Sequence, residues 1–234
     1  MEDIKKIIED CNLKHIAIIM DGNRRWAKEK NLPSAVGHKK GVDALKNTLI
    51  ACDVLGIKYL TVYAFSTENW NRKPEEVEFL MNLLGETIKK ELKDLHKNNV
   101  VIRFIGDTSK LKTGLQDILK NAEDTTKNNN GVNLQIAFNY GARAEIVKAI
   151  KDIINSCEQN ITEEVVSEHL YTKGIPDPDV LIRTGGEMRV SNYLLWQIAY
   201  SEIIVIPEFW PDFDKNALEK CVLEFAKRSR RYGK

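Results

Sequence analysis

Cysteine and histidine are scarce in this sequence, and neither is arranged as in a metal site. The 234 residues include four cysteines, at positions 11, 52, 157 and 221, which lie far apart and form no CxxC pair. This spacing indicates free thiols in a reducing cytosol rather than a disulfide framework. The four histidines form no HExxH motif, so the sequence argues against a zinc site.

Long hydrophobic runs and a surplus of one charge sign are missing as well. No apolar stretch approaches the roughly 20 residues of a membrane span, and the N-terminus, Met-Glu-Asp-Ile-Lys-Lys, lacks the apolar segment of a signal peptide. The 35 basic and 34 acidic residues leave a formal net charge of +1, whereas a nucleic-acid-binding domain carries a broad basic excess. We therefore expect a soluble, cytoplasmic protein that binds no nucleic acid and whose anion sites are local.

Common phosphate-binding and nucleophile motifs are absent too. The chain has no GxxxxGK[ST] loop, no GxGxxG after an apolar run and no GxSxG elbow. A Walker-type nucleotide site, a dinucleotide fingerprint and a serine-hydrolase site are thereby disfavoured. An aspartyl phosphatase usually needs a second acid two residues after its nucleophile, but Asn23 follows Asp21 at that spacing.

The apolar residues are distributed as in a single α/β domain. Short runs rich in branched residues predict strands, and longer stretches with apolar residues three and four positions apart predict helices. The two patterns alternate, which is typical of a mostly parallel sheet covered by helices. No repeat or linker divides residues 1–234, so the hydrophobic residues, 43% of the total, are expected to form one core. The predicted strands are 15–20, 58–65, 100–105, 132–138, 179–182 and 202–206, and the predicted helices are 39–55, 74–97, 109–127, 142–157 and 214–230.

The most informative segment is residues 15–26, His-Ile-Ala-Ile-Ile-Met-Asp-Gly-Asn-Arg-Arg-Trp. Its apolar run predicts a strand buried on both faces, which ends at the turn triplet beginning with Asp21. Open α/β sheets bind ligands just beyond the carboxyl ends of their strands. A carboxylate beside Arg24 and Arg25 would suit a Mg²⁺-bound polyphosphate, since the acid holds the metal and the arginines hold the oxygens. A loop acid neutralised by its own arginines is the alternative.

Two further segments carry polar residues at the end of a strand or the start of a helix. Residues 63–72, Tyr-Ala-Phe-Ser-Thr-Glu-Asn-Trp-Asn-Arg, could bind a substrate, but Ser and Asn are also good N-cap residues and Pro74 suits a first helical turn. Residues 37–41, Gly-His-Lys-Lys-Gly, open a predicted helix, whose amino end favours anions. A lone histidine is more often structural, so neither segment is decisive alone.

Residues 181–192, Leu-Ile-Arg-Thr-Gly-Gly-Glu-Met-Arg-Val-Ser-Asn, place hydrogen-bond donors around a glycine pair. Gly185 and Gly186 would let backbone amides approach an anion, as in a nest. Arg183, Arg189 and Ser191 would add further donors, and together they predict a second phosphate pocket. A glycine turn with surface arginines is the alternative.

Together these segments resemble one family over nearly the whole chain, the cis-prenyltransferases (isoprenyl transferases), which include the bacterial undecaprenyl diphosphate synthases. Several long motifs occur in the family's order and at about its spacing. The matching stretches are HIAIIMDGNRRWA (15–27), GHKKG (37–41), YAFSTENWNR (63–72), IGDTSKL (105–111), NYGAR (139–143), DVLIRTGGEMRVSNYLLWQIAYSE (179–202) and FWPDF (209–213).

The resemblance implies a six-stranded, mostly parallel sheet surrounded by helices, an apolar product tunnel and a homodimer. It implies Mg²⁺-dependent, repeated condensation of isopentenyl diphosphate with an allylic diphosphate, such as farnesyl diphosphate. The product would be a long-chain Z-polyprenyl diphosphate such as undecaprenyl diphosphate, the precursor of the lipid carrier for cell-wall glycans. Such an apolar product suggests transient contact with a membrane surface for release.

The resemblance also implies roles for residues of this chain. Asp21 matches the catalytic acid that positions Mg²⁺, and Glu202 matches a second metal-associated acid. Asn69 matches the residue assigned as proton acceptor. Because an amide is a very weak base, we expect Asn69 to position a diphosphate oxygen or a water that takes the proton. The residues implied in substrate binding are Gly22, Asn23, Arg24, Arg25, Trp26, His38, Ser66, Thr67, Glu68, Trp70, Arg72, Arg183, Arg189, Val190 and Ser191.

One departure from the family pattern concerns the allylic diphosphate. Many members have an arginine four residues before the histidine of the GH motif, where this chain has Ser34. Either the allylic diphosphate binds more weakly, or a nearby lysine supplies the charge without the bidentate fork of arginine. The candidate lysines are Lys28, Lys39 and Lys40.

Other features concern the metal, the C-terminus and the product. Some relatives have a histidine where this chain has Met188, a poor Mg²⁺ ligand, so metal binding is expected to rest on Asp21, the diphosphate and Glu202. Residues 230–233 resemble the family's Arg-x-Gly tail, which can reach toward the partner subunit's site, and a frayed basic tail is the alternative. The product length is expected to depend on the tunnel wall, for which the candidates are Ala64, Leu84, Ile88 and Leu134.

Two other functions remain as alternatives to the enzyme. Some relatives keep the fold as a non-catalytic partner subunit or receptor, and these typically lose the Asp-Gly-Asn-Arg segment, which is present here from Asp21. A nucleic-acid or nucleotide-binding α/β module would need a basic excess or a phosphate fingerprint, and the sequence has neither.

Overall fold

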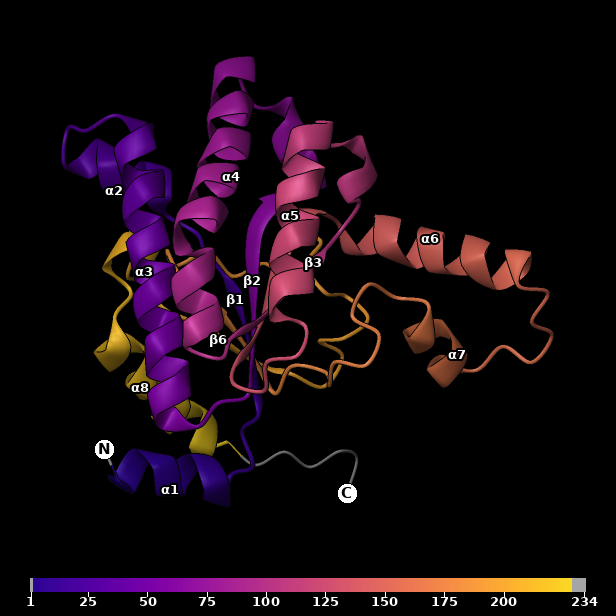
Figure 1. Cartoon of the computed structure of the whole chain (residues 1–234). Helices are drawn as coiled ribbons and strands as arrows, with labels where there is room; N and C mark the ends of the chain where they lie inside the picture. The colour runs from indigo at the N-terminus through magenta and orange to yellow at the C-terminus, as the bar shows by residue number, and fades with distance from the viewer. Residues whose placement is uncertain (1, 229–234) are drawn as a thin grey trace.

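A single parallel sheet forms the centre of the protein in the computed structural model, which describes residues 2–228 (Figure 1). The strand order is β3–β4–β2–β1–β5–β6, and every pairing in it is parallel. The predicted six-stranded sheet is confirmed, and the strand ends differ from the predicted ones by at most two residues. The strands are β1 (His15–Ile19), β2 (Tyr59–Ser66), β3 (Val101–Ile105), β4 (Asn133–Tyr140), β5 (Val180–Arg183) and β6 (Glu202–Val205).

Helices surround this sheet, and three of them were not predicted. The helices α1, α2 and α7 span only nine, seven and six residues, so each covers roughly two turns. The helix predicted over 39–55 begins earlier, at Ser34, directly after Pro33. Within residues 2–228 the α-helices are α1 (Glu2–Asp10), α2 (Asn23–Glu29), α3 (Ser34–Leu55), α4 (Pro74–Lys97), α5 (Thr113–Thr126), α6 (Ala142–Asn155), α7 (Glu163–Glu168) and α8 (Lys215–Ala226), and the 3-10 helices are η1 (Thr67–Asn71), η2 (Thr108–Lys110) and η3 (Trp210–Asp212).

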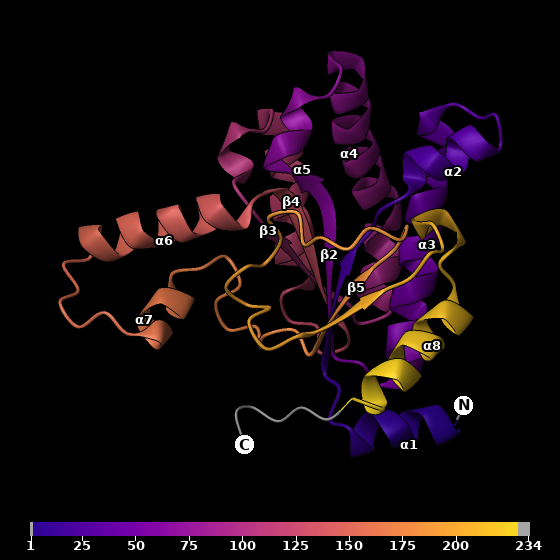
Figure 2. The ribbon, with the colours of Figure 1, turned by 180° about the vertical axis from the view of Figure 1, so that it is seen from behind.

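The apolar run 16–19 forms the centre of the sheet, as its composition predicts. Every residue of β1 is buried, because β2 and β5 flank it and covering segments lie on both faces. The larger core cluster lies between the sheet and α1, α3, α4, α5 and α8 (Figures 1 and 2). A smaller cluster on the opposite face contains Tyr140, Tyr193 and Leu194.

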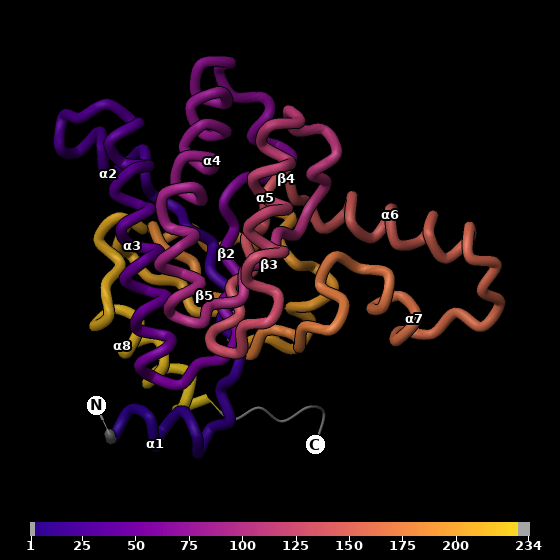
Figure 3. The backbone as a smooth tube through the Cα atoms, viewed as in Figure 1, coloured from indigo at the N-terminus to yellow at the C-terminus, as the bar shows by residue number. Residues whose placement is uncertain are grey.

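The helix α6 is arranged differently from the helices over the main core. It extends away from them in the ribbon and in the backbone trace (Figures 1 and 3). Its residues Val147, Ile150 and Ile154 are exposed, and their spacing of three and four places them on one side of the helix. None of the helices in the described chain is long and apolar enough to span a membrane.

The parallel arrangement brings three predicted site segments to one edge of the sheet. Ile19 pairs with Tyr63 of β2 on one side and with Arg183 of β5 on the other. Asp21 therefore follows the carboxyl end of the central strand, with the ends of β2 and β5 beside it. Ligands bind at this edge in open α/β sheets.

Candidate active site

The carboxylate of Asp21 lies between two arginines at the carboxyl edge of the sheet. Arg183 Nη2 donates to Asp21 Oδ2 at 2.8 Å, and Arg25 Nη2 lies 3.3 Å from the same oxygen. Partial burial raises the pKa of Asp21, but the hydrogen bond from Arg183 and the charges of both arginines outweigh it and hold the pKa below its ordinary value. Asp21 is therefore ionised at neutral pH and can bind a cation.

Arg183 fixes the position of Asp21 from the end of β5. Arg183 is only 4% exposed, so protein groups surround its guanidinium almost completely. Nη1 donates to Ser191 Oγ at 2.9 Å and to the carbonyl oxygen of Arg189, while the buried Nε has no hydrogen-bond partner in the described chain. One side chain thus joins the carboxylate of Asp21 to the segment that follows β5.

The glycine pair after β5 does not form the predicted anion nest. The Gly185 N–H donates to the carbonyl of Glu208, and the Gly186 N–H donates to that of Ile206. Both amides are therefore already used by the chain. The alternative raised by the sequence is correct for the glycine turn, since both glycines have a positive φ, but Arg183 is buried rather than at the surface. A Cβ at Gly185 would also lie 2.5 Å from Arg25 Nη2, so the glycine makes room for that arginine.

Asn69 is held by the turn that connects β2 to η1. Ser66 and Asn69 form a capping box, in which each side chain binds the other residue's backbone N–H. Asn69 Oδ1 accepts from the Ser66 N–H at 3.2 Å. The capping alternative raised by the sequence is thus correct for the oxygen atom of Asn69.

Glu76 in the first turn of α4 gathers the cationic side chains around the site. Its Oε1 accepts from Arg72 Nη1 at 2.9 Å and lies 3.7 Å from His38 Nε2, which is too far for a hydrogen bond. Arg24 Nη1 lies 3.9 Å from Oε2. Burial and the charge of Arg72 lower the pKa of His38, although Glu76 opposes them. His38 is therefore neutral at neutral pH.

Two glycines in α3 place His38 beside the turn after β1. A Cβ at Gly37 would lie 2.1 Å from the carbonyl oxygen of Asn23, and one at Gly41 would lie 2.4 Å from Asn23 Oδ1. Only glycine allows α2 and α3 to approach this closely. The GHKKG segment was predicted at the start of a helix, but it lies within α3, which begins at Ser34. Its glycines allow the close packing of α3 against α2.

These side chains surround two polar pockets that meet at Asp21. Met20, Asp21, Asn23, His38 and Arg72 line both pockets. The first polar pocket is further lined by Gly22, Arg24, Arg25, Lys28, Asn31, Leu32, Pro33 and Ser34. The second polar pocket is further lined by Ile19, Tyr63, Ala64, Ser66, Glu68, Asn69, Leu80, Arg183, Arg189, Ser191 and Asn192.

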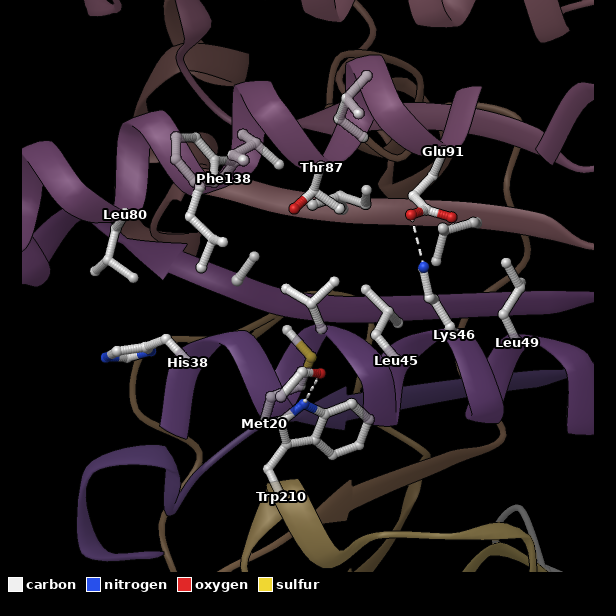
Figure 4. A pocket seen from close by; sticks show the side chains of 18 of the residues that line it. Met20, His38, Leu45, Lys46, Leu49, Leu80, Thr87, Glu91, Phe138 and Trp210 are labelled. Atoms are coloured by element: carbon white, nitrogen blue, oxygen red, sulfur yellow. Dashed lines mark hydrogen bonds and ion pairs between the residues drawn. The ribbon is translucent and has the colours of Figure 1, made fainter. Parts of the chain in front are cut away.

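A third space, the apolar cavity, extends inward from the polar pockets (Figure 4). Met20, Asn23 and His38 also line this cavity, so it begins where the two polar pockets meet. Its walls are α3, α4 and the strands β2 and β4, and its volume is about 140 Å³. All four residues predicted to line an apolar tunnel, Ala64, Leu84, Ile88 and Leu134, lie in this wall.

Four residues that the resemblance assigned to substrate binding line neither polar pocket. Trp26 is buried and donates from Nε1 to Asp212 Oδ1 at 2.8 Å, and Val190 packs against the smaller core cluster. Trp70 donates to Asn139 Oδ1 at 2.7 Å. Thr67 and Trp70 line a separate small pocket, away from both polar pockets. Residues 67–71 form a 3-10 helix, so successive side chains point in different directions.

The structure also separates Glu202 from Asp21 within the chain. Glu202 begins β6 and pairs with Val180, the first residue of β5, whereas Asp21 follows the last residue of β1. The two acids therefore lie at opposite edges of a parallel sheet. Glu202 instead receives a hydrogen bond from Arg228 at 3.0 Å. Its predicted metal role is not supported within one chain, and the predicted C-terminal tail, residues 230–233, lies outside the described residues.

Sequence reasoning missed Asn192 as a residue that organises the site. Its Nδ2 donates to Glu68 Oε1 at 2.8 Å, its Oδ1 accepts from the Arg143 N–H, and its carbonyl accepts from the Ala142 N–H. It thus connects the segment after β5 to η1 and to the start of α6. The residue type was itself a signal in the sequence, because asparagine tolerates a positive φ such as the 60° found at Asn192.

The donor set fits a metal ion that is shared with a substrate rather than one caged by the protein. No group of three or more His, Cys, Asp or Glu side chains in residues 2–228 is placed to hold a metal. Mg²⁺ commonly binds one or two carboxylates and completes its coordination with substrate phosphates and water. Asp21, ionised and located where the two polar pockets meet, meets this requirement.

Comparison with known sequences places this site in a family. The family model described as "Putative undecaprenyl diphosphate synthase" matches residues 19–233. The chain is 50% identical to an isoprenyl transferase of Clostridium tetani over 226 residues, covering 94% of this chain and 89% of the relative. It is 48% identical to an isoprenyl transferase of Clostridium perfringens over 240 residues, covering 99% of this chain and 95% of the relative.

Two crystal structures have a similar fold. Lavandulyl diphosphate synthase from Lavandula x intermedia, in complex with dimethylallyl diphosphate, matches with a TM-score of 0.92 and 34% identity, covering 96% of this chain and 100% of that chain. A probable undecaprenyl diphosphate synthase from Campylobacter jejuni matches with a TM-score of 0.82 and 34% identity, covering 95% and 99%. On its sequence and its fold, the chain belongs to the isoprenyl transferases, the cis-prenyltransferase family of enzymes.

Proposed function

We propose that this isoprenyl transferase condenses isopentenyl diphosphate repeatedly with an allylic diphosphate to form a long-chain Z-polyprenyl diphosphate, such as undecaprenyl diphosphate. The observation that carries the proposal is the joining of two polar pockets at Asp21, both continuous with the apolar cavity. Two pockets suit two diphosphates, and the cavity suits the hydrocarbon part of one of them.

The first polar pocket would hold the allylic diphosphate. Arg24 and Arg25 face it from α2, and Lys28 lines it near Ser34. Lys39 and Lys40 do not line it, so Lys28 is the lysine placed to supply the charge that Ser34 lacks. The hydrocarbon chain would then enter the apolar cavity past Met20 and His38.

The second polar pocket would hold isopentenyl diphosphate. Arg183, Arg189 and Ser191 line it, and guanidinium groups bind phosphate oxygens through charge-assisted hydrogen bonds. Arg183 is fixed by its own contacts to Ser191 and Asp21. Such a fixed donor would orient the second substrate toward the allylic carbon and lower the entropic cost of the reaction.

Asp21 would hold Mg²⁺ together with the diphosphate. When bound, Mg²⁺ supplies positive charge that offsets the charge on the departing diphosphate. Arg25 is close enough to Asp21 to stabilise the same charge. The role of these residues is therefore to make the diphosphate a better leaving group.

The condensation then requires one bond change and one proton loss. The terminal alkene carbon of isopentenyl diphosphate bonds to the allylic carbon as the C–O bond to diphosphate breaks, and a neighbouring C–H proton leaves to form the new double bond. Asn69 Oδ1 already accepts from Ser66, so its Nδ2 group would position a diphosphate oxygen or a water that takes this proton.

The similarity to other proteins supports the same substrate class. The lavandulyl diphosphate synthase of matching fold was crystallised with dimethylallyl diphosphate, which is an allylic diphosphate. The matching family model is named for undecaprenyl diphosphate synthase. Both point to prenyl diphosphates as substrates of this chain.

We further propose that the chain forms a homodimer through α6. The exposed residues Val147, Ile150 and Ile154 form an apolar surface on a helix that extends away from the main core. A second copy of the chain would bury this surface, and burial of apolar area is the main favourable contribution to protein association.

One assay tests the enzymatic proposal. Purified protein would be incubated with Mg²⁺, farnesyl diphosphate and radiolabelled isopentenyl diphosphate, and chain length would be read by chromatography. We expect a long product that EDTA and Asp21→Ala abolish. Asp43→Ala is the matched control, because Asp43 is paired with Lys40 outside the polar pockets. No incorporation with farnesyl, geranyl or geranylgeranyl diphosphate would favour a non-catalytic partner subunit instead.

A further inference from the structure

An ion pair crosses the apolar cavity between its two helical walls. Lys46 Nζ of α3 lies 2.6 Å from Glu91 Oε1 of α4. Figure 4 shows this contact bridging the space between the two helices, on the side away from His38. The surrounding wall is aliphatic and includes Leu45, Leu49 and Ile88. A pair of opposite charges is unexpected in a wall that would hold hydrocarbon.

The pair lies well inside the cavity rather than at its entrance. His38, which lines both polar pockets, precedes Lys46 by eight residues on α3, and Leu80, at the second polar pocket, precedes Glu91 by eleven on α4. At about 1.5 Å of rise per residue, the pair is roughly 12 to 16 Å from the diphosphate sites.

The cavity continues for only a short distance beyond the pair. Leu49 lies three residues after Lys46 on α3, and Leu95 lies four residues after Glu91 on α4; both line the cavity. Each is about one helical turn further along its helix. The pair is thus followed by a single further layer of side chains.

The cavity volume implies that a long product must pass or displace this pair. A cavity of about 150 Å³ in another protein holds one benzene molecule, and the apolar cavity here has about 140 Å³. A product of several isoprene units needs more space than that. Because Lys46 and Glu91 hold α3 to α4, they oppose the helix separation that would provide it.

A hydrocarbon chain that passes the pair must separate two opposite charges. The side chain of Glu91 is 15% exposed and that of Lys46 is 37% exposed, so Lys46 extends toward solvent while the carboxylate is mostly covered. Separating them against hydrocarbon would leave the carboxylate without its partner in an apolar wall, which is costly. The intact pair therefore resists separation of α3 from α4.

We propose that the Lys46–Glu91 ion pair limits product length, because the growing prenyl chain must separate α3 from α4 against this contact as it lengthens. This inference rests on the proposed chain elongation. It assigns a specificity role to two residues that lie outside both polar pockets and belong to different helices.

The test compares product lengths in variants that remove or reverse the pair. In Lys46→Met/Glu91→Leu, apolar side chains replace both charges, and we expect the main product to lengthen by at least one isoprene unit. The charge-reversed variant Lys46→Glu/Glu91→Lys can re-form the pair, and we expect it to return the main product to the wild-type length. Restored length in a reversed pair would not result from side-chain volume alone.

Lys90→Met is the matched control for loss of a lysine near Glu91. Lys90 Nζ lies 3.9 Å from the same oxygen, but its side chain is 80% exposed and does not line the cavity. We expect this variant to make the wild-type product. Urea denaturation of each variant would show that it is folded.

The outcomes separate this inference from the proposed function. If wild-type protein makes no prenyl product, the proposed function fails. If wild-type protein elongates but the neutral double variant makes products of unchanged or shorter length, the ion pair does not limit the chain and the inference is overturned. Longer products from Lys90→Met would overturn it as well, because they would indicate a general effect of surface charge.

Discussion

Asp21 and Arg183 are 162 residues apart in the sequence and are joined by a 2.8 Å hydrogen bond at the carboxyl ends of two neighbouring strands. This contact keeps Asp21 ionised despite its partial burial. It also places the carboxylate proposed to hold Mg²⁺ at one substrate site beside an arginine of the other proposed site. The two sites are therefore electrostatically coupled through one pair of side chains.

The first prediction concerns the pKa of Asp21. Arg183→Met should raise this pKa, because burial remains while the largest favourable contact is lost. In the wild type the pKa is lowered, so the stability from the pair is present above the ordinary aspartate pKa and is lost as pH falls through the lowered value. Carboxyl ¹³C NMR titration of the folded variants would measure the shift, and an unchanged pKa would contradict the proposed coupling.

The second prediction separates positioning from proton acceptance at Asn69. If Asn69 accepted the proton, Asn69→Asp would be active; if its Nδ2 group positions the acceptor, this variant should be about as inactive as Asn69→Ala. A carboxylate can still accept the Ser66 N–H bond, so Asn69→Asp should keep stability, whereas Asn69→Ala should lose about 1 kcal/mol with the cap. Steady-state kcat and urea denaturation measure the two effects.

The third prediction concerns Lys28, which lines the first polar pocket together with Ser34. Lys28→Met should raise the KM for the allylic diphosphate roughly tenfold, because a charged contact to phosphate contributes about 1.5–3 kcal/mol. Adding Ser34→Arg to that variant should lower the KM again. Lys40→Met is the control, since Lys40 is paired with Asp43 outside the pocket. An unchanged KM in Lys28→Met would remove this lysine from the allylic site.

The fourth prediction concerns the close packing of α2 on α3. Gly37→Ala should destabilise the protein by about 1–3 kcal/mol and raise the KM for the allylic substrate, because its Cβ would lie 2.1 Å from a backbone oxygen of α2. Gly114→Ala is the matched helical control, as nothing lies within 4 Å of its Cβ position. Urea denaturation and kinetics of both variants decide the matter, and equal effects would contradict the packing argument.

The fifth prediction concerns the proposed dimer. The double variant Ile150→Asp/Ile154→Asp should be monomeric at concentrations where wild type is dimeric, because two charges would have to be buried in the interface. Ile50→Asp is the control, since Ile50 is also exposed but lies on α3. Sedimentation equilibrium provides the measurement. A dimeric double variant would place the interface elsewhere.

Much of the fold follows from local pattern in the sequence. The apolar run 16–19 predicted a strand buried on both faces, and it is the strand flanked by β2 and β5. The apolar stripe over 74–97 predicted a helix with those ends, and α4 spans Pro74–Lys97. The helix α2 was missed because it has only seven residues, and what fixes its position is close contact with Gly37 of α3.

The candidate site was predictable in its residue types but only partly in its geometry. Asp21 was predicted at a polyphosphate site and Arg183 in a second phosphate pocket, and the two side chains are in direct contact. Trp26 and Trp70 were expected at the substrate. In the structure, the indole of Trp26 donates to Asp212 and that of Trp70 donates to Asn139. The position of Glu202 was implicit in the sequence, since the first residue of a parallel strand lies at the edge opposite Asp21.

The sequence by itself therefore determined the central strand, the alternation of strands and helices, and the acid that follows the first strand. These features depend on which residues are buried locally, and local burial shows in the sequence as a regular spacing of apolar residues. Only the tertiary structure decided that the glycine amides after β5 are already hydrogen-bonded and that Lys46 meets Glu91 across the cavity. Contacts between distant segments depend on how the sheet brings its helices and loops together, and no local pattern records them.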